Sequence, residues 1–459
     1  MGRVPGELVR FLRRGSSILL IKGGPGTGKT ILSLELLRRF SKRSTGIYLG
    51  TRVSAERMLI QHPWLKGFVD PQHFLTTEAP PAGRISISDT RFRESPMENL
   101  FEVAMEAENP FVVIDSWEVV AKRVGEREGN KALEVLETLV ASKKTNLVFV
   151  SETTGETPLD FQADGMVALS LEEVEGRTLR VLDLRKLRGI RIGQRKQLFS
   201  LDRGRFHYLP PFNSKGFGKE VGWKTIPDSK THFSTGCVAL DRLLGGGYPR
   251  GGTVLLEVHP HVPRIVSGIF SVSVIANFFS QGRGFMGIPS ESWGLGEITD
   301  LGRHLFGEQA FELPIRILTT AEPSEQTPYI VQLTGEDMES DFEVWRKTQD
   351  ALLEETGQPV LSITHMRKQV DRYGEDAYVK ALGLSVDSLR RSGGIEIRIS
   401  TAGIENVTRK AAELADTYLS IETRFGCVYL YGVKPFTSIH RIGVRFSTGV
   451  SKLDLMPVV

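Results

Sequence analysis

Short apolar segments alternate with helical patterns through the first half of the chain. Ser17–Lys22 and Gly46–Gly50 predict buried strands, and Ile31–Phe40 between them carries apolar residues at helical spacing. Ser54 follows as a typical N-cap of a further helix, and Phe111–Ile114 is another continuous apolar run. The alternation indicates an α/β fold with a mostly parallel central sheet flanked by helices.

The pattern changes towards the middle of the chain. Lys131–Ala141 is amphipathic, and Asn146–Val150 predicts one more buried strand. Met166–Leu171 and Leu179–Leu184 then predict two strands joined by a short turn. Residues 209–232 show no periodicity and are rich in Pro, Gly, Lys and Ser, which is typical of a linker or of a loop that crosses between domains.

The second half repeats the first in outline. Leu240–Leu244 precedes a glycine-rich turn and an apolar strand, as Leu8–Leu12 does in the first half. Ala415–Ser420 likewise resembles Ala163–Ala168, and each is followed by a turn, an apolar run and a lysine. Two such matches in the same order predict a duplicated domain.

Composition narrows the class of protein. The 459 residues suffice for an N-terminal domain over residues 1–210, a linker over 211–232 and a second domain over 233–459. A net charge of +3 permits nucleic acid as a partner without favouring it. Two cysteines, Cys237 and Cys427, are too few for a disulfide framework. Since no apolar run is long enough for a signal peptide or a membrane span, we expect a cytoplasmic protein without a membrane partner.

A phosphate-binding loop follows the first predicted strand. Residues 23–30 match the pattern G-x-x-x-x-G-K-[ST] between a strand and a helix. Glycines let backbone N–H groups approach phosphate oxygens closely, and the helix directs its positive end at the same anion. The residues predicted to bind ATP are Gly23, Gly24, Pro25, Gly26, Thr27, Gly28, Lys29, Thr30 and Ile31.

Two of the predicted site residues serve a magnesium ion. Thr30 offers a hydroxyl next to Lys29, whose ammonium can reach the β- and γ-phosphates. Asp115 ends the apolar run Phe111–Ile114 and therefore lies at the carboxyl edge of the expected sheet. We expect Thr30 and Asp115 to hold Mg²⁺ beside the nucleotide.

These features together resemble the KaiC-like branch of the RecA-type ATPases. The resemblance also rests on the start of the second domain, which reads Ser234-Thr235-Gly236, then Leu240-Asp241, then Leu243-Leu244-Gly245-Gly246-Gly247-Tyr248-Pro249-Arg250-Gly251. It covers nearly the whole chain. It implies tandem RecA-like P-loop domains that form homo-oligomers, including hexameric rings, with ATP between subunits.

The chain departs from that family where a glutamate pair normally serves as catalytic base. Arg52 and Val53 stand there, and neither accepts a proton from water at neutral pH. Glu56, Glu118 and Glu152 are the substitutes that the sequence offers, so the general base stays unassigned. We therefore expect the first domain to bind ATP and to be at most a weak ATPase.

Lys186-Leu187-Arg188-Gly189 resembles the Lys-x-Arg-Gly element of KaiC-like domains. Lys186 and Arg188 would share one face of a strand. The resemblance implies that both reach the γ-phosphate of a neighbouring subunit and are catalytic there together with Lys29. The alternative is a solvated basic edge strand, because Arg177, Arg180, Arg185 and Arg191 lie nearby.

The second domain keeps the start of the fold without its phosphate loop. After the predicted strand Thr253–Leu256, the segment Glu257–Ile265 contains two prolines and a glutamate and no glycine, so we expect no nucleotide there. His259 and His261 form a lone His-x-His pair, which is more often structural than metal-binding.

Three functions fit these observations. The leading one is a regulatory or scaffolding ATPase, in which ATP in domain 1 switches assembly or the binding of an unidentified protein, and domain 2 is a pseudo-ATPase platform. The alternative is a DNA recombination or repair ATPase related to the RadA group, which would bind single-stranded DNA with strong salt dependence. An active autokinase is least favoured, because the glutamate pair is missing.

Overall fold

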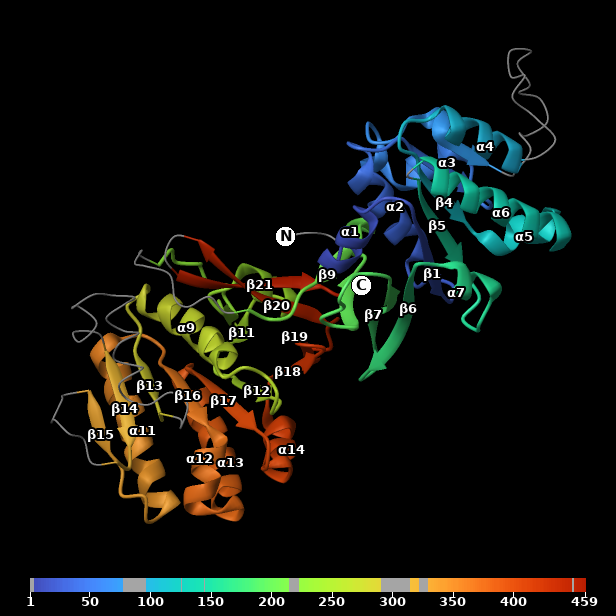
Figure 1. Ribbon diagram of the computed structural model, residues 1–459. Helices are drawn as coiled ribbons and strands as arrows, with labels where there is room; N and C mark the ends of the chain where they lie inside the picture. The colour runs from blue at the N-terminus through green and yellow to red at the C-terminus, as the bar shows by residue number, and fades with distance from the viewer. Residues whose placement is uncertain are drawn as a thin grey trace. The chain divides into compact units, whose positions relative to one another are not determined.

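The computed structural model describes residues 4–76, 96–124, 126–143, 145–213, 223–289, 314–321, 329–447 and 450–459. The chain divides into two compact units, Met1–Pro210 together with Val458–Val459, and Pro211–Pro457. In Figure 1 the first unit runs mostly from blue to green, and the second from yellow-green to red.

The first unit is built on one sheet with the strand order β3-β2-β4-β5-β1-β6-β7-β8-β9. Its strands are β1 (Ser17–Gly23), β2 (Gly46–Gly50), β3 (Phe74–Thr76), β4 (Phe111–Asp115), β5 (Asn146–Ser151), β6 (Gly165–Val174), β7 (Arg177–Leu187), β8 (Lys196–Ser200) and β9 (His207–Leu209). Its helices are α1 (Gly6–Leu12), α2 (Lys29–Phe40), α3 (Ala55–Gln61), α4 (Pro96–Glu106), α5 (Trp117–Val124), α6 (Glu126–Lys143) and α7 (Pro158–Gln162), with 3₁₀ turns η1 (Pro63–Leu65), η2 (Pro71–His73) and η3 (Asp202–Gly204).

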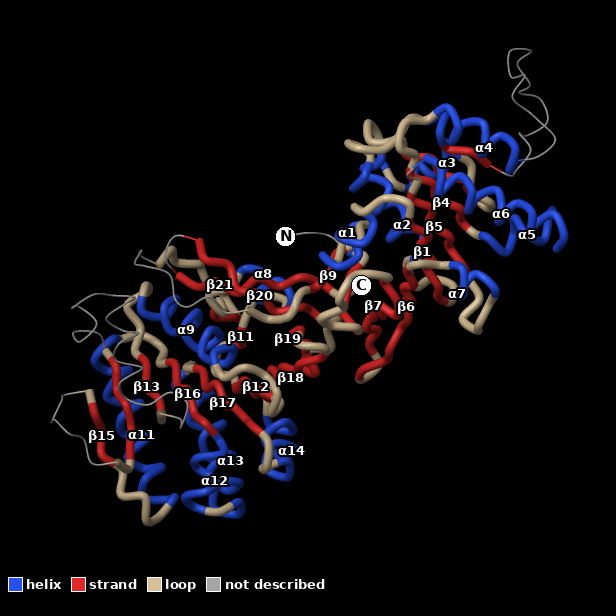
Figure 2. The backbone as a smooth tube through the Cα atoms, in the orientation of Figure 1, coloured by secondary structure: helices blue, strands red, loops and turns tan. Residues whose placement is uncertain are grey.

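Strand β1 lies in the parallel part of this sheet, which is covered on both faces, whereas β6, β7, β8 and β9 pair with one another in antiparallel fashion. It pairs in parallel with β5 and β6, and every one of its residues is buried. Leu19 and Ile21 pack into one hydrophobic cluster with α1 and α2, while Ile18 and Leu20 pack into another with α4, α5 and α6. Figure 2 shows these helices on the two sides of the strands. The predicted α/β fold is therefore confirmed for this unit.

The second unit has the strand order β15-β14-β13-β16-β17-β12-β18-β19-β20-β21, beside a short β10-β11 ladder. Its strands are β10 (His232–Phe233), β11 (Tyr248–Pro249), β12 (Thr253–Val258), β13 (Phe285–Gly287), β14 (Ile315–Thr319), β15 (Ile330–Gln332), β16 (Leu361–His365), β17 (Ile395–Thr401), β18 (Thr417–Arg424), β19 (Cys427–Lys434), β20 (His440–Ser447) and β21 (Val450–Pro457). Its helices are α8 (Val238–Leu243), α9 (Ile265–Phe279), α11 (Met338–Thr356), α12 (Met366–Tyr373), α13 (Glu375–Ser392) and α14 (Glu405–Leu414). Across the described parts of both units, no helix is both long and apolar enough to span a bilayer.

The two sheets share one plan. The run β2-β4-β5-β1-β6-β7-β8-β9 of the first unit corresponds to β13-β16-β17-β12-β18-β19-β20-β21 of the second. An aspartate holds the start of the central strand in each unit: Asp164 accepts a bond from the Ile18 N–H at 3.1 Å, and Asp416 accepts one from the Thr253 N–H at 2.8 Å. The chain is thus a tandem of RecA-like α/β folds, and the matched pair Asp164 and Asp416 explains the repeated Ala-Asp in the sequence.

Part of the predicted linker is bound to the second unit. Asn277 on α9 is fully buried, and its Oδ1 accepts bonds from the Ile226 N–H at 2.8 Å and from the Trp223 indole at 3.2 Å. Its Nδ2 donates to the Ile226 carbonyl at 3.0 Å. The lack of periodicity in residues 223–231 therefore reflects an irregular segment that α9 fixes in place.

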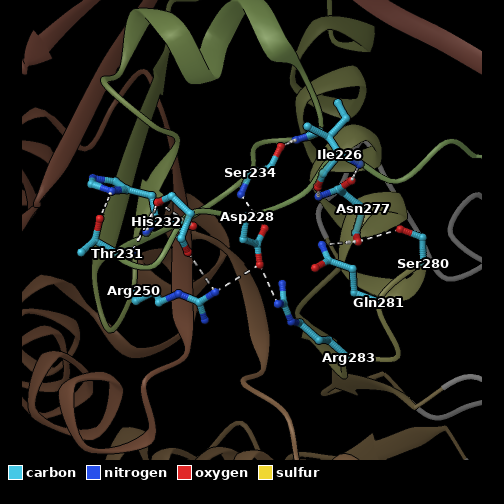
Figure 3. Close-up of polar contacts among 12 residues, drawn as sticks. Ile226, Asp228, Thr231, His232, Ser234, Arg250, Asn277, Ser280, Gln281 and Arg283 are labelled. Carbon is cyan, nitrogen blue, oxygen red and sulfur yellow. Dashed lines mark hydrogen bonds and ion pairs between the residues drawn. The ribbon is translucent and has the colours of Figure 1, made fainter.

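Asp228 fixes the same segment through charge, as Figure 3 shows. Its Oδ2 lies 2.6 Å from an Arg283 nitrogen and 3.3 Å from an Arg250 nitrogen. Both guanidinium groups lie over the Phe233 ring, at 5.0 and 4.2 Å from its centre. One carboxylate thus joins two arginines at the beginning of the second unit.

The last two residues of the chain belong to the first unit. Val458 is 3% exposed, and the Val459 carbonyl accepts a bond from the Leu201 N–H at 2.8 Å. The Val459 N–H reaches the Ser200 hydroxyl at 3.4 Å. Consequently, the chain leaves the first unit at Pro210 and returns to it after β21.

Candidate nucleotide-binding site

The predicted phosphate loop connects β1 to α2. β1 ends at Gly23 and α2 begins at Lys29, so the residues predicted to bind ATP, Gly23–Ile31, span the loop and the first helical turn. Gly28 has a φ of 97°, and a Cβ there would lie 2.9 Å from the Leu201 side chain. Because a residue with a side chain rarely adopts that φ, the motif and the geometry agree. The helix N-terminus favours an anion at the loop.

Lys29 lies inside this loop. It is 7% exposed, and its Nζ donates to the Gly24 carbonyl at 2.8 Å. Burial lowers the pKa of Lys29, while the carboxylates of Glu152, Asp115 and Glu118 act in the opposite direction. A cation buried among nearby acids is suited to bind a polyphosphate that carries a metal ion.

The structure brings Thr30 and Asp115 together as the sequence predicts. The Thr30 hydroxyl donates to Asp115 Oδ2 at 2.7 Å. Asp115 ends β4, which runs parallel to β2 and β5, so its carboxylate lies at the carboxyl edge of the sheet beside the loop. Burial raises the pKa of Asp115, and the bonds from Thr30 and Tyr48 oppose that shift. The contact confirms the predicted proximity of the two residues.

Tyr48 was not predicted as a site residue. Its hydroxyl donates to Asp115 Oδ2 at 2.9 Å from the neighbouring strand β2. The signal in the sequence was a lone hydroxyl within the otherwise apolar Gly46–Gly50, since a buried tyrosine normally finds a hydrogen-bond partner. Thr51 supports the same strand end, because its hydroxyl donates to the Asp115 carbonyl at 3.0 Å.

The donor set fits a magnesium ion that is shared with phosphate. Both side-chain bonds to Asp115 end on Oδ2, which leaves Oδ1 without a hydrogen bond to any described residue. One carboxylate and the Thr30 hydroxyl are hard oxygen ligands of the kind that Mg²⁺ takes. No cluster of three or more His, Cys, Asp or Glu side chains that could hold a metal occurs in the described ranges. Phosphate and water oxygens would therefore have to complete the coordination.

Arg52 forms an ion pair where the expected glutamates are missing. Its guanidinium lies 2.7 Å from Glu152 Oε2, and the two side chains are 61% and 33% exposed. Val53 packs against the hydrophobic cluster that contains Leu32 and Leu34. Arg52 is thus paired with Glu152, the acid that raises the pKa of Lys29 the most.

The other two substitute acids have different surroundings. Glu118 at the start of α5 accepts a bond from the Ser151 hydroxyl and one from the Thr153 N–H at 3.4 Å. Glu56 lies exposed on α3 and is not among the acids that act on Lys29. Of the three, Glu152 and Glu118 are therefore the acids near the lysine.

The predicted shared strand of Lys186 and Arg188 needs correction. β7 ends at Leu187, so Lys186 is its penultimate residue and Arg188 lies in the following turn. Arg188 is 62% exposed and pairs with Asp164 Oδ1 at 2.9 Å within the same chain. The turn to Gly189, which has a φ of 72°, ends the strand and breaks the alternation that would have put both residues on one face.

Arg180 contacts the phosphate loop and was not predicted. Its guanidinium donates to the Gly26 carbonyl at 2.9 Å from β7, and burial lowers its pKa. Its Nε is buried without a hydrogen-bond partner among the described residues. Because several arginines surround it in the sequence, composition alone could not single it out.

The corresponding position in the second unit holds side chains of the chain itself. β12 ends at Val258, and His259 Nε2 then lies 3.3 Å from the Ser420 hydroxyl and 3.9 Å from Glu422 Oε1. Glu257 accepts a bond from the Tyr418 hydroxyl. His259 therefore contacts side chains of its own unit, as expected for a histidine with a structural role.

Comparison with known families identifies two matching segments. Residues 9–185 match the model of the GvpD gas vesicle protein, P-loop domain, and residues 222–327 match that of GvpD basic region 2. The first segment contains the loop, Tyr48 and Asp115. The first unit is therefore a P-loop domain of the nucleotide-binding type.

Similar proteins come from archaeal sources. Protein GvpD1 of Halobacterium salinarum is 26% identical over 523 aligned positions, which cover 99% of this chain and 96% of that protein. Protein GvpD2 of the same organism is 27% identical over 479 positions, with the same coverage of 99% and 96%. A UPF0273 protein of Pyrococcus horikoshii is 27% identical over 209 positions, which cover 41% of this chain and 84% of that protein.

Proposed function

We propose that the chain is a GvpD-like regulatory ATPase, in which ATP and Mg²⁺ at the first unit switch assembly or the binding of a protein partner. This proposal rests mainly on the hydrogen bond of 2.7 Å from the Thr30 hydroxyl to Asp115 Oδ2, at the end of the phosphate loop. That arrangement supports a nucleotide with its metal as the ligand. The matched family models and the two relatives from Halobacterium salinarum carry the name GvpD, and the P-loop model is described as a gas vesicle protein, so we propose the same physiological setting for this chain.

The second unit takes part as a platform that binds no nucleotide. His259 and Glu257 fill the end of β12 with contacts to Ser420 and Tyr418. A carboxylate at that point also repels phosphate. A ligand that binds only one of two conformations shifts their populations, so a single nucleotide site suffices for a switch.

Slow hydrolysis is part of this proposal. The ion pair between Arg52 and Glu152 supports it, because the guanidinium occupies a carboxylate oxygen that would otherwise be free to contact an attacking water. General-base assistance contributes roughly 10²–10⁴-fold to the rate, and its loss would leave a long-lived bound state. A long-lived bound state suits a switch better than rapid turnover does.

The KaiC-like assembly, with ATP between the subunits of a ring, is the finer part of the proposal. The exposure of Arg188 supports it, since the ion pair of 2.9 Å with Asp164 is at the surface and costs little to break. Lys186 and Arg188 would then contact the nucleotide of a neighbouring copy.

Calorimetry with a non-hydrolysable ATP analogue and Mg²⁺ tests nucleotide binding. The expected stoichiometry is one nucleotide per chain. Lys29→Ala should weaken binding by about 100-fold, because a buried cation that pairs with phosphate is lost. His259→Ala, at the corresponding place in the second unit, is the matched control and should bind as the wild type does. Two nucleotides per chain, or none, would overturn the proposal.

The RadA-related alternative predicts tight, salt-dependent binding of single-stranded DNA. A filter-binding titration at two salt concentrations, with and without Mg-ATP, distinguishes it from the regulatory ATPase. ATP-dependent DNA binding would favour the alternative, whereas its absence together with stoichiometric ATP binding would favour the proposed function.

A further inference from the structure

The second unit contains a two-chambered cavity away from the end of β12. The inner chamber has a volume of about 50 Å³ and the outer one of about 210 Å³. The same four residues line both chambers, namely Ile288, Leu333, Gln369 and Tyr373. The two chambers are therefore adjacent parts of one space, lined by residues of α11, α12, α13 and the sheet.

The outer chamber lies at the carboxyl end of parallel strands. Ile288 follows β13, Thr320 follows β14 and Leu333 follows β15, and these strands pair in parallel. In open α/β sheets, ligands typically bind outside the carboxyl ends of the strands. The cavity thus lies where this architecture usually places a ligand.

Gln369 shows that the cavity is suited to a polar ligand. The residue is 7% exposed and borders both chambers. Its side-chain amide makes no hydrogen bond to any described residue. Because this amide faces the two chambers without a protein partner, its NH₂ group is available to donate a hydrogen bond to a bound acceptor.

Basic groups border the outer chamber next to that amide. Arg372 uses its Nε to bind the Gly335 carbonyl at 2.9 Å, and its terminal nitrogens have no partner among the described residues. Lys368 also lines the chamber and donates to the Pro289 carbonyl at 3.1 Å. Asp371 is balanced by Arg367, which lies 2.8 Å away. A guanidinium with two free nitrogens matches a carboxylate geometrically.

The inner chamber is apolar and small. Its lining includes Trp345, Phe342, Met338 and Leu382, and its 50 Å³ is well below the roughly 150 Å³ of a cavity that holds benzene. It therefore accepts a short aliphatic chain and excludes an aromatic ring. Among its polar lining residues, Asp341 already accepts bonds from the Tyr373 hydroxyl and from the Gly335 N–H, each at 2.7 Å.

We propose that this cavity binds a small organic carboxylate with a short aliphatic chain. The carboxylate lies between Arg372, Lys368 and the Gln369 amide, and the chain enters the inner chamber towards Trp345 and Leu382. The site goes beyond the proposed function, since it lies in the unit without a phosphate loop. It would give the protein a metabolite input that is separate from ATP.

Ligand-observed NMR and calorimetry on the full chain test this site with 4-methylpentanoate. A dissociation constant of about 1 mM or tighter is expected for a ligand of this size. Arg372→Met should weaken binding at least tenfold, and Ala381→Leu should do the same by filling the inner chamber. Arg409→Met, which removes an exposed arginine on α14 outside the cavity lining, should leave binding unchanged.

Two further probes separate the sources of affinity. The uncharged 4-methylpentanol and inorganic phosphate should each bind at least tenfold more weakly than the carboxylate. Equal binding of the alcohol, tighter binding of phosphate, or no carboxylate binding up to about 20 mM would overturn the assignment. Because Lys29→Ala leaves this cavity intact, carboxylate binding in that variant distinguishes failure of this site from failure of the ATP site.

Discussion

Asp115 connects the phosphate loop to the sheet through one carboxylate. Thr30 and Tyr48 both donate to its Oδ2, from the first turn of α2 and from β2. Burial raises its pKa above that of an ordinary aspartate. The ionised form therefore lowers the stability of the ligand-free fold and becomes favourable when a cation binds.

The first prediction concerns Asp115→Asn. A raised pKa in the folded state means that stability is greatest below the unfolded pKa and is lost as the pH rises through the folded pKa. The variant should therefore be more stable than the wild type at neutral pH without ligand, and this difference should shrink on acidification. Its affinity for Mg-ATP should fall by about tenfold or more. Thermal denaturation over a pH series, with and without Mg-ATP, measures both effects.

Ser116→Ala is the control for that experiment. Its hydroxyl is buried without a hydrogen-bond partner among the described residues, so its loss touches neither Thr30 nor Tyr48. Nucleotide-dependent stabilisation should persist in this variant. If Asp115→Asn kept the full Mg-ATP effect, Asp115 would not be a metal ligand.

The second prediction concerns Arg52→Ala. Removing the guanidinium frees Glu152, which lies 2.7 Å away, to accept a proton from water. Steady-state ATP hydrolysis should rise about tenfold, and the double variant with Glu152→Gln should lose that gain. Arg57→Ala, an exposed arginine nearby on α3, is the control. A rate that falls in Arg52→Ala would instead assign Arg52 to phosphate binding.

At the scale of elements, the sequence predicted most of the first unit because burial and periodicity coincide there. Phe111–Ile114 became β4, and Lys131–Ala141 lies within α6. Tyr48 and Arg180 escaped prediction because their roles depend on contacts between neighbouring strands or across to the loop. The phosphate loop could be predicted from the sequence because its residues are contiguous in the chain.

Residues 223–231 show the limit of composition as a guide to linkers. Lysine, proline and serine there suggested a linker, yet Asn277 and Asp228 fix the segment by hydrogen bonds and charge. Such contacts come from residues far away in the sequence. No local pattern in the segment itself could have revealed them.

The third prediction tests this attachment with Asn277→Ala. The substitution leaves the N–H and carbonyl of Ile226 without their partner, which costs about 2–4 kcal/mol of unfolding free energy. Urea denaturation should show a destabilised second unit, and trypsin should cut faster at the exposed Lys224 and Lys230. Ser280→Ala on the same helical segment removes one local bond and should change little. Unchanged trypsin sensitivity would mean that Asn277 does not hold the segment.

At the scale of the whole molecule, the two units share one strand order but differ in the chemistry at the end of the central strand. The strand orders correspond, and Asp164 and Asp416 occupy equivalent places. Only the first unit has the phosphate loop after its central strand. This asymmetry is consistent with one unit that senses nucleotide and another that takes a different ligand or partner.

The fourth prediction concerns Arg188→Ala and assembly. Arg188 is 62% exposed, and its surface ion pair with Asp164 contributes at most about 1 kcal/mol, so the fold should survive. Mass photometry should show that Mg-ATP increases the particle mass of the wild type, because oligomers form, and that it leaves the particle mass of the variant unchanged. Arg185→Ala, another exposed arginine that pairs with an acid, is the control and should assemble normally. Assembly of Arg188→Ala at wild-type level would refute the contact with a neighbouring nucleotide.

The return of Val458 and Val459 to the first unit affects any attempt to divide this protein genetically. Val459 binds the backbone of Leu201, and the Leu201 side chain borders Gly28 in the phosphate loop. A fragment truncated at Pro210 would lack Val458 and Val459 and the hydrogen bond to Leu201. Weak nucleotide affinity in such a half-protein would then reflect a missing dipeptide and not communication from the other half.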